Sequence, residues 1–483
     1  MELGARHGEH HGFRLGPVTV LVLTSHPFQR AGAWTVACLA GRDHPDRVTE
    51  ADLDAAVERI VADEVMAAVV DKGAAGYGWW KVMFNFFPNS ATTHATRAHD
   101  PDVLARSMRA LFEPDDTASE TWPCVYCGQQ AGAVWGKTGL QLVASERLLN
   151  TTPPGVAGWP VCRPCRVAAR ALPYGSALAP AVATVLAASD EEVERAFVAD
   201  CWRANRSMLA AGAQDVPGRS ESPEAAVVRV VRSLPRARGD GTLWTFKNAN
   251  DPAQAVLRVD HLRGGTPSFL VRLGADPLAE AGWRAMERAL TVPRRDGTVI
   301  RGSDAVARLL FHRETTEGRW RADLVQKASS IARSGSVAGP DLALVGALVR
   351  RYVKEVLALT EDVLGRVEEV ADAVASYIKA ASSRARFQLF RRADGQWRLA
   401  RYLREVEADR ILSGGGPARI TAASWNLLSS NDARAQTARD LLFFAVCERL
   451  PEGFSQGEEE EEEEEELAAR VLAGTGTPEE EFA

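Results

Sequence analysis

The chain lacks both a long apolar run and a signal-peptide pattern. No stretch of its 483 residues reaches the ~18 consecutive apolar residues that a membrane-spanning helix needs, and the longest candidate, Ser176 to Ser189, is interrupted by Pro180. Residues 1–16 contain three histidines and no apolar core typical of a secretory signal. We therefore expect an intracellular, cytoplasmic protein that is not integral to a membrane and has no membrane partner.

Lysine is also scarce, since 50 of the 57 cationic residues are arginine. A GC-rich genome produces the same bias, but arginine also suits nucleic acid because its guanidinium binds phosphate in two-pronged fashion and stacks on bases. Residues 452–483 hold thirteen Glu and one Arg, a net charge of -12, so the rest of the chain carries +5. The positive charge is concentrated in residues 201–333, with 22 Arg or Lys against 14 acids, and in residues 384–410, with eight Arg against four acids.

Seven cysteines are few for a disulfide scaffold, and four of them form two closely spaced pairs. Cys124 and Cys127 are followed, after 34 residues, by Cys162 and Cys165. Two such turns present four thiolates, which is the ligand set of a closed tetrahedral zinc site. With every position filled by protein, the metal stabilises the fold and has no place for water or substrate. We expect a structural zinc ion here; the alternative is four buried thiols without metal.

The chain lacks the residues that would make this segment a nuclease. Residues 128–161 contain no His or Asp and a single Glu, Glu146, and the whole interval from Asp100 to Asp260 contains no His. A metal-dependent nuclease needs a general base and an acidic or imidazole metal ligand. The sequence Gly136-Lys137-Thr138 also lacks the preceding glycine of a phosphate-binding loop, since Ala131 occupies that position. We therefore predict a binding protein rather than an enzyme, with Lys137 as a candidate contact to a phosphate backbone.

Length and hydrophobic pattern predict several domains of the α+β class. The chain is about three times as long as a typical domain of ~150 residues. The expected parts are a flexible tail over 1–16, a mixed α/β domain over 17–213 with a zinc ribbon inserted at about 120–175, a mixed basic region over 224–333, a helical bundle over 340–450 and an acidic, disordered tail over 451–483.

Local patterns predict individual elements within these parts. Strands are expected at Val18–Leu23, Trp79–Ser90, Leu243–Phe246, Ala255–Val259 and Ser268–Leu273. Helices are expected at about 31–39, 103–112, 191–209, 396–411 and 432–450. A further helix is expected to begin directly after Thr49, which would cap its N-terminus. Apolar residues spaced by threes and fours from Val345 to Tyr377 predict about nine turns of one amphipathic helix.

Five segments, in order along the chain, resemble the large subunit of type I CRISPR interference (Cascade) complexes, particularly its zinc-containing I-B branch. They are Thr24–Gly32, similar to the family's opening Thr-Gly-x-Pro-Phe pattern; Phe86–Ser90, an aromatic and Asn/Ser turn; Gly158–Val161, leading into the second cysteine pair; Arg166–Ser176, a short helix; and Phe246–Asn250, a turn between strands. Together with the cysteine pairs they span about half the chain. This sequence has Ser25 where the family has glycine.

The resemblance implies a non-catalytic subunit of an RNA-guided complex that acts in antiviral defence. Such a subunit recognises the protospacer-adjacent motif in double-stranded target DNA and contacts the guide RNA, the other subunits of the complex and a helicase-nuclease effector. Guide pairing reads the sequence, while the protein reads a short duplex element and the phosphate backbone.

Candidate nucleic-acid contacts follow from this implied role. In the polar turn after a predicted strand, amide side chains suit base edges, and arginines position the backbone. The candidates are Lys137, Lys247, Asn248, Asn250, Arg258, Arg294, Arg295, Arg386, Arg391 and Arg392. A simple hairpin connection or a solvated helix face would produce the same local patterns. The alternative function is a zinc-ribbon regulator that binds DNA without a guide.

Overall fold

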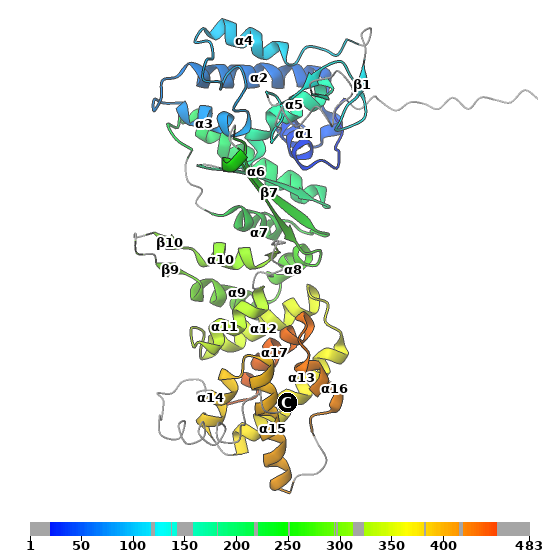
Figure 1. The fold of residues 1–483 in the computed structure, drawn as a ribbon, viewed down its shortest axis with the longest axis vertical. Helices are drawn as coiled ribbons and strands as arrows, with labels where there is room; N and C mark the ends of the chain where they lie inside the picture. Colours follow the sequence, from blue (N-terminus) through cyan, green and yellow to red (C-terminus); the bar gives the residue numbers. More distant parts are fainter. Residues whose placement is uncertain are drawn as a thin grey trace, which may run out of the picture. The chain divides into compact units, whose positions relative to one another are not determined.

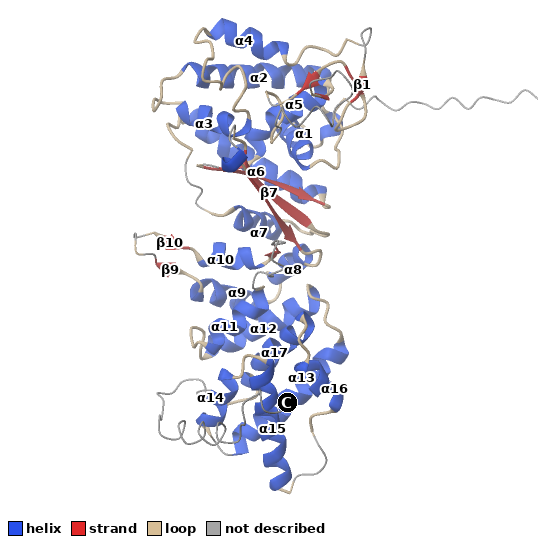
Figure 2. Ribbon diagram, viewed as in Figure 1, coloured by secondary structure: helices blue, strands red, loops and turns tan. Residues whose placement is uncertain are grey.

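A computed structural model confirms the expected α+β class. It describes residues 20–116, 121–136, 138–142, 158–180, 182–216, 221–249, 252–293, 295, 298–312, 323–380, 383–414 and 419–451. Helices dominate this part of the chain, the strands are few and mostly short, and the C-terminal region is helical (Figure 2). None of the helices in these ranges is long and apolar enough to cross a membrane.

The helices and strands follow one another as labelled in Figure 1. The α-helices are α1 (Pro27–Leu39), α2 (Glu50–Val69), α3 (Tyr77–Phe86), α4 (Pro101–Ala110), α5 (Arg163–Ala171), α6 (Glu191–Ala210), α7 (Pro223–Ser233), α8 (Thr266–Leu273), α9 (Pro277–Ala289), α10 (Gly302–Leu309), α11 (Leu324–Arg333), α12 (Pro340–Glu355), α13 (Glu361–Ala380), α14 (Arg384–Arg392), α15 (Gln396–Leu412), α16 (Ala422–Ser429) and α17 (Ala433–Cys447). Short 3-10 turns are η1 (Pro45–Arg47), η3 (Leu172–Gly175) and η4 (Pro252–Gln254).

The strands form one sheet of five and three sheets of two. They are β1 (Trp122–Pro123), β2 (Gln130–Ala131), β3 (Val134–Trp135), β4 (Trp159–Pro160), β5 (Ala177–Ala179), β6 (Val182–Ala188), β7 (Gly241–Lys247), β8 (Val256–Leu262), β9 (Val292–Pro293), β10 (Val299–Ile300) and β11 (Phe311–His312). The five-stranded sheet has the order β11-β8-β7-β6-β5, with β5 antiparallel to β6 and β11 antiparallel to β8. The small sheets pair β1 with β2, β3 with β4 and β9 with β10, all antiparallel.

The chain divides into two compact units. Unit 1 comprises Met1–Ala187, Glu194–Arg219 and Trp244–Arg258, and unit 2 comprises Ala188–Val193, Ser220–Leu243 and Val259–Ala483. Unit 1 therefore contains both cysteine pairs, and unit 2 contains all helices from α7 to α17.

In unit 1, helices α1 and α2 pack against α5 over a core rich in aromatic residues. Trp34, Trp79 and Phe86 are almost completely buried in this core. Helix α1 approaches α5 closely at Gly32, where a Cβ atom would lie 2.1 Å from the carbonyl oxygen of Ala168. Only glycine fits this approach, which gives a physical reason for the glycine that ends the Thr24–Gly32 segment.

In unit 2, helix α12 packs against α9, and α17 packs against α11, α12, α13 and α16. The buried side of α12 carries Val345, Leu348, Val349 and Tyr352, whose spacing of three and four places them on one face. Helix α17 is buried on nearly all sides, with Leu441 to Val446 forming a continuous buried run. An almost fully buried helix needs a surrounding shell of other helices, which explains why the C-terminal region is a multi-helix assembly.

Most predicted helices are confirmed, with boundaries close to those expected. Thr49 caps α2 through a reciprocal capping box, in which its hydroxyl accepts from the Asp52 N–H and the Asp52 carboxylate accepts from the Thr49 N–H. Asp432 caps α17 by accepting from the Ala435 N–H at 2.8 Å. The strands expected at Leu243–Phe246 and Ala255–Val259 are present as β7 and β8.

The prediction of a strand at Val18–Leu23 is wrong for residues 20–23, the part of this segment that the structure describes. These residues have no regular secondary structure. Leu21 is completely buried there, so the apolar run does enter the core. The backbone of this segment bonds to a side chain instead of a strand, because the Gln29 amide donates to the Val22 carbonyl at 2.8 Å and accepts from the Thr24 N–H at 3.1 Å.

Two further predicted strands are helices. Residues 79–86 of the strand expected at Trp79–Ser90 lie in α3, in which Trp79, Val82, Met83 and Phe86 are buried at helical spacing. Residues 268–273 lie in α8, which begins with Pro267 in its first turn and buries Phe269, Leu270 and Leu273. Both segments are dense in aromatic or apolar residues, and a short run of that kind does not distinguish a strand from a buried helix.

The single long helix expected from Val345 to Tyr377 is two helices, α12 and α13. The break lies at residues 356–360, where Ala358 adopts a left-handed conformation with φ of 50°. The apolar spacing continues across the break because both helices bury one face in the same region of unit 2, so periodicity alone did not reveal it.

Candidate metal centre

The first cysteine pair lies in a tight turn between β1 and β2. The Cys124 N–H donates to the Gln129 carbonyl at 2.7 Å, and the Gly128 N–H donates back to the Cys124 carbonyl at 2.9 Å. Gly128 has φ of 76°, a conformation that glycine adopts without steric cost and that closes the turn. This geometry directs the thiols of Cys124 and Cys127 toward the same point.

The second pair lies at the start of α5. Cys162 is the N-cap residue and Pro164 occupies the first helical turn, where its missing N–H costs nothing. The Arg166 N–H donates to the Cys162 carbonyl at 2.9 Å, and this first turn brings Cys165 beside Cys162. A hydrogen bond of 2.9 Å from the Val125 N–H to the Pro160 carbonyl joins the first turn to the strand that leads into the second.

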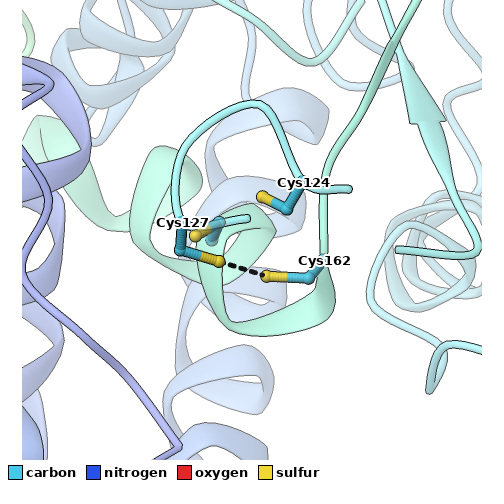
Figure 3. Close-up of side chains that lie close together, drawn as sticks. Cys124, Cys127 and Cys162 are labelled. Carbon is cyan, nitrogen blue, oxygen red and sulfur yellow. Dashed lines mark hydrogen bonds between the residues drawn. The ribbon is translucent and has the colours of Figure 1, made fainter. Parts of the chain in front are cut away.

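The four thiols come together as one cluster. Figure 3 shows three of them, Cys124, Cys127 and Cys162, with their sulfur atoms turned toward one another. Their sulfur atoms all lie within 4.8 Å of one another, and the Cys127 and Cys162 sulfurs are 3.4 Å apart. Cys124, Cys162 and Cys165 are 4%, 2% and 1% exposed, and Cys127 is half-buried. Zinc–sulfur bonds of about 2.3 Å in a tetrahedron separate sulfurs by roughly 3.8 Å, which agrees with this spacing. The cluster can therefore hold a metal ion with four protein ligands.

Because the four thiols are packed this closely, their pKa values differ from one another. Hydrogen bonds from the other three cysteines lower the pKa of Cys124. Hydrogen bonding with Cys124 and Cys127 raises the pKa of Cys162 and of Cys165, and burial acts in the same direction. The first cysteine pair therefore loses protons more readily than the second, and four thiolates together require a positive ion between them.

Gln29 connects the segment before α1 to this cluster. Its side chain is almost completely buried, and its amide nitrogen lies 3.9 Å from the Cys165 sulfur, as a weak donor to it. Nearby, the His26 ring packs edge-on against the Tyr126 ring of the first cysteine turn at 4.8 Å. Burial lowers the pKa of His26, so this imidazole is neutral at neutral pH. The Thr24–Gly32 segment is thus packed against the two cysteine turns.

Asp115 anchors the cysteine region on the α2–α4 side, and the sequence analysis missed it. Its carboxylate accepts from the Gly132 N–H at 3.1 Å, the Arg163 N–H at 2.7 Å and the Arg166 guanidinium at 2.8 Å. Arg166, almost fully buried, also donates to the Leu111 carbonyl at 2.6 Å. An aspartate in the connection between α4 and β1 carries no sequence signal of this role, because its partners lie 17 to 51 residues away.

A fully buried ion pair lies deeper in unit 1. The Arg170 guanidinium and the Glu64 carboxylate are both 0% exposed and bond at 2.6 Å from Nε to Oε1. The same guanidinium donates to the Ser90 hydroxyl at 2.8 Å and lies over the Phe87 ring at 3.9 Å from its centroid. The Phe86–Ser90 segment therefore forms the pocket that surrounds a buried charge.

The predicted nucleic-acid contacts in unit 1 differ in accessibility. Asn248 is buried, its side chain donates to the Phe86 carbonyl at 2.9 Å, and its N–H donates to the Asn85 carbonyl at 3.1 Å. Its amide is thus used within the fold and is not exposed to a base edge. Lys247 is half-buried at the end of β7. Arg258 is half-buried on β8 and approaches the Thr245 hydroxyl at 3.5 Å.

In unit 2, two of the predicted arginines are tied into the helical region. Arg386 donates to the Tyr377 carbonyl at 2.8 Å and to Asp409 at 3.1 Å, and its guanidinium lies 3.8 Å from the centre of the Tyr377 ring. Arg391 donates to the Arg333 carbonyl, which fastens α14 to the end of α11.

Arg392 and Arg295 are exposed. Lys137, Asn250 and Arg294 lie outside the described residues. Among the predicted arginines with a described position, Arg295 and Arg392 are therefore the ones whose side chains face solvent.

The segments that carry the family resemblance meet in the core of unit 1. Phe28 packs against Phe246 with ring centres 4.7 Å apart, and Phe86 contacts the same ring at 5.1 Å. The Asn248 bond to Phe86 and the Arg170 bond to Ser90 add polar contacts between these segments. Residues more than 200 positions apart in sequence thus share one aromatic cluster.

Comparison with protein-family models, with curated proteins and with solved structures found no match to this chain.

Proposed function

We propose that this protein is the non-catalytic large subunit of an RNA-guided, DNA-targeting CRISPR complex of type I, similar to the I-B branch. The observation that carries the proposal is that the resembling segments pack on one another. Thr24–Gly32, Phe86–Ser90, Arg166–Ser176 and Phe246–Asn250 contact each other or the cysteine cluster within unit 1. Weak local matches that appear in order and also share one core support a common architecture better than isolated matches would.

In this proposal the four cysteines bind a structural zinc ion. A closed site of four sulfurs leaves no open coordination position, so the ion holds the two cysteine turns together and does not take part in a reaction. The residues that hold it are Cys124, Cys127, Cys162 and Cys165.

The proposed role in the cytoplasm is recognition of a protospacer-adjacent motif in double-stranded target DNA. The partners are the guide RNA, the other subunits and a helicase-nuclease effector. Base pairing by the guide selects the target sequence, and the protein contributes contacts to the duplex and to phosphates. Asn248 is buried, and Arg258, Arg386 and Arg391 have bonding partners within the fold. We therefore assign the contacts to the half-buried Lys247 and to the exposed Arg295 and Arg392.

Affinity purification of the tagged full chain from its native host tests the proposal. We expect co-purification of other complex subunits and of short RNAs that share a constant 5′ end. Protein that purifies without RNA and without partners, yet binds a specific duplex, would instead support a zinc-ribbon regulator that acts without a guide. Metal-dependent cleavage of DNA by the isolated chain would contradict a non-catalytic role.

A plasmid-interference assay tests the assigned contacts. Arg295→Gln and Lys247→Gln are expected to reduce interference against targets next to a motif library while leaving co-purified RNA and subunits unchanged. The matched control is Arg203→Gln, an exposed arginine on α6 that pairs with Asp200 of the same helix. Equal interference by all three variants would remove Arg295 and Lys247 from the proposed contact surface.

A further inference from the structure

Unit 2 contains a cavity that the proposed function does not use. Its volume is about 620 Å³, within the roughly 300–1,000 Å³ typical of small-molecule sites. Separate elements of unit 2 line it: the residue after β8, strand β11, the start of α11, the α12–α13 connection and the first turns of α17. Side chains from five places in one unit therefore converge on a single space.

One wall of the cavity is apolar. It consists of Leu357, Ala358 and Leu359, which connect α12 to α13. Ala358 has φ of 50°, an unfavourable conformation for a residue with a Cβ atom. Such strained positions cluster at ligand sites, because the surrounding structure must hold them in place.

The acidic groups that line the cavity already have partners. Asp323 caps α11 and accepts from the Gln326 N–H at 3.0 Å. Asp440 is buried and accepts from the Gln436 side chain at 3.2 Å. These carboxylates are therefore largely used within the protein.

The basic groups that line it are not used in this way. Arg263 is half-buried and Arg434 is exposed, and neither guanidinium makes a hydrogen bond or ion pair to a residue in the described part of the chain. The backbone N–H of Arg434 donates to Asp432, two residues before it, and the Arg434 charge interacts electrostatically with the same carboxylate. Arg263 and Arg434 are therefore the charged groups of the lining whose guanidinium donors are unused within the described part of the chain, and such donors suit an anionic ligand.

Two buried polar side chains close to these groups also lack partners. His312 lines the cavity, is 8% exposed, and its Nε2 atom has no hydrogen-bond partner among the described residues. The hydroxyl of Tyr352, fully buried, has none either, and this residue interacts electrostatically with Arg263 and Asp323. Buried polar atoms are normally paired, so unpaired ones beside a cavity are consistent with a site that is completed by a bound molecule.

We propose that this cavity binds a free mononucleotide. Arg263 and Arg434 bind its phosphate, because guanidinium groups donate two parallel hydrogen bonds to phosphate oxygens. The wall of Leu357 to Leu359 packs against one face of the base, and the remaining acceptor positions of Asp323 face the ribose hydroxyls. This inference is independent of the proposed role in an RNA-guided complex.

Calorimetric titration of the full chain with AMP, GMP, CMP and UMP tests the inference, with inorganic phosphate as a separate probe. We expect at least one mononucleotide to bind more tightly than phosphate. Arg263→Gln should weaken that binding about tenfold or more, as expected from the loss of a charged hydrogen bond. Thr437→Trp, which fills the cavity from α17, should weaken it to a similar extent.

Arg404→Gln is the matched control, since Arg404 is exposed on α15 and does not line the cavity. Circular dichroism establishes that each variant is folded. Three outcomes would overturn the inference: no mononucleotide binds the folded protein, inorganic phosphate binds as tightly as any mononucleotide, or binding is the same in wild type, Arg263→Gln and Thr437→Trp. Competition by an oligonucleotide of the same base at equal site affinity would assign the cavity to nucleic acid instead.

Discussion

The two units are stabilised in different ways. Unit 1 buries the charged pair Arg170 and Glu64 and brings four thiols into one cluster, so polar groups from distant parts of the chain depend on one another. Unit 2 buries apolar stripes, such as Val363, Val367 and Val370 of α13, while many of its ion pairs are exposed. Losing one polar partner in unit 1 leaves the others buried without compensation, whereas losing one apolar side chain in unit 2 removes only its own contacts.

Removal of metal should distinguish the units most strongly. Structural zinc contributes about 10–16 kcal/mol of apparent binding free energy in small peptide sites, comparable to the whole stability of a domain. A strong chelator, or Cys162→Ser, is expected to abolish hydrogen-exchange protection in unit 1 and to leave it in α12, α13 and α17.

Cys38→Ser is the control for that experiment, because Cys38 is half-buried in α1 and lies outside the cluster. Elemental analysis should find one zinc ion per chain in the untreated protein. A chain that contains no transition metal but retains full protection in unit 1 would refute a structural metal.

Breaking the buried ion pair should have the next largest effect. Arg170→Met alone leaves the Glu64 carboxylate buried without its cation, at an expected cost of about 3–5 kcal/mol in the free energy of unfolding. The double variant Arg170→Met with Glu64→Leu should recover most of that loss, since neither charge then remains. Urea denaturation of the three proteins measures both values. Equal stability of the single and double variants would show that the pair does not act as a unit.

A truncation in unit 2 should cost less and remain local. Leu348→Ala on α12 removes a completely buried side chain, and such changes cost about 2–5 kcal/mol. We expect faster hydrogen exchange in α9, α12 and α17, with no change in the metal content of unit 1. Loss of metal in this variant would show that the cysteine cluster depends on the packing of α12.

Acid should weaken unit 2 through His312. Burial lowers the pKa of this imidazole from 6.5 to about 4. Between these values the unfolded chain binds a proton that the folded chain does not, so stability present above pH 6.5 is lost as the pH falls toward 4. The effect should be smaller than that of Leu348→Ala, because the ring lines a cavity and can be partly hydrated.

Denaturation of unit 2 at pH 7 and pH 5 measures this effect. In His312→Gln the difference between the two pH values should shrink, while in His94→Gln, an exposed histidine of unit 1, it should stay as in wild type. An unchanged difference in His312→Gln would assign the pH dependence to other groups.

The sequence pattern predicted the helices of unit 2 better than it predicted the strands of unit 1. The stripe from Val345 to Tyr377 was correctly helical but hid the break at Ala358, since both helices bury one face. In unit 1, the aromatic run at 79–90 suggested a strand where α3 forms. Dense apolar runs lack the polar positions that separate a period of two from one of 3.6.

The candidate site was predictable where its chemistry is local. Two cysteine pairs at close spacing indicated the four-sulfur cluster without any tertiary information. Gln29, Asp115 and Arg166 were not predicted, because each acts through partners far away in sequence. Asn248 was expected at a nucleic-acid surface, yet its amide is bonded within the core.

The sequence alone determined the two cysteine pairs that could hold a metal, the capping residue Thr49 and the helical character of the C-terminal region, because these depend on residues a few positions apart. Only the tertiary structure decided which polar side chains are buried and which remain available to a ligand. Arg170, Arg386 and Arg263 are the same residue type, but one is buried in an ion pair, one is bonded to a neighbouring helix and one lines a cavity. Burial and hydrogen-bond partners are set by contacts between distant segments, and no local pattern records them.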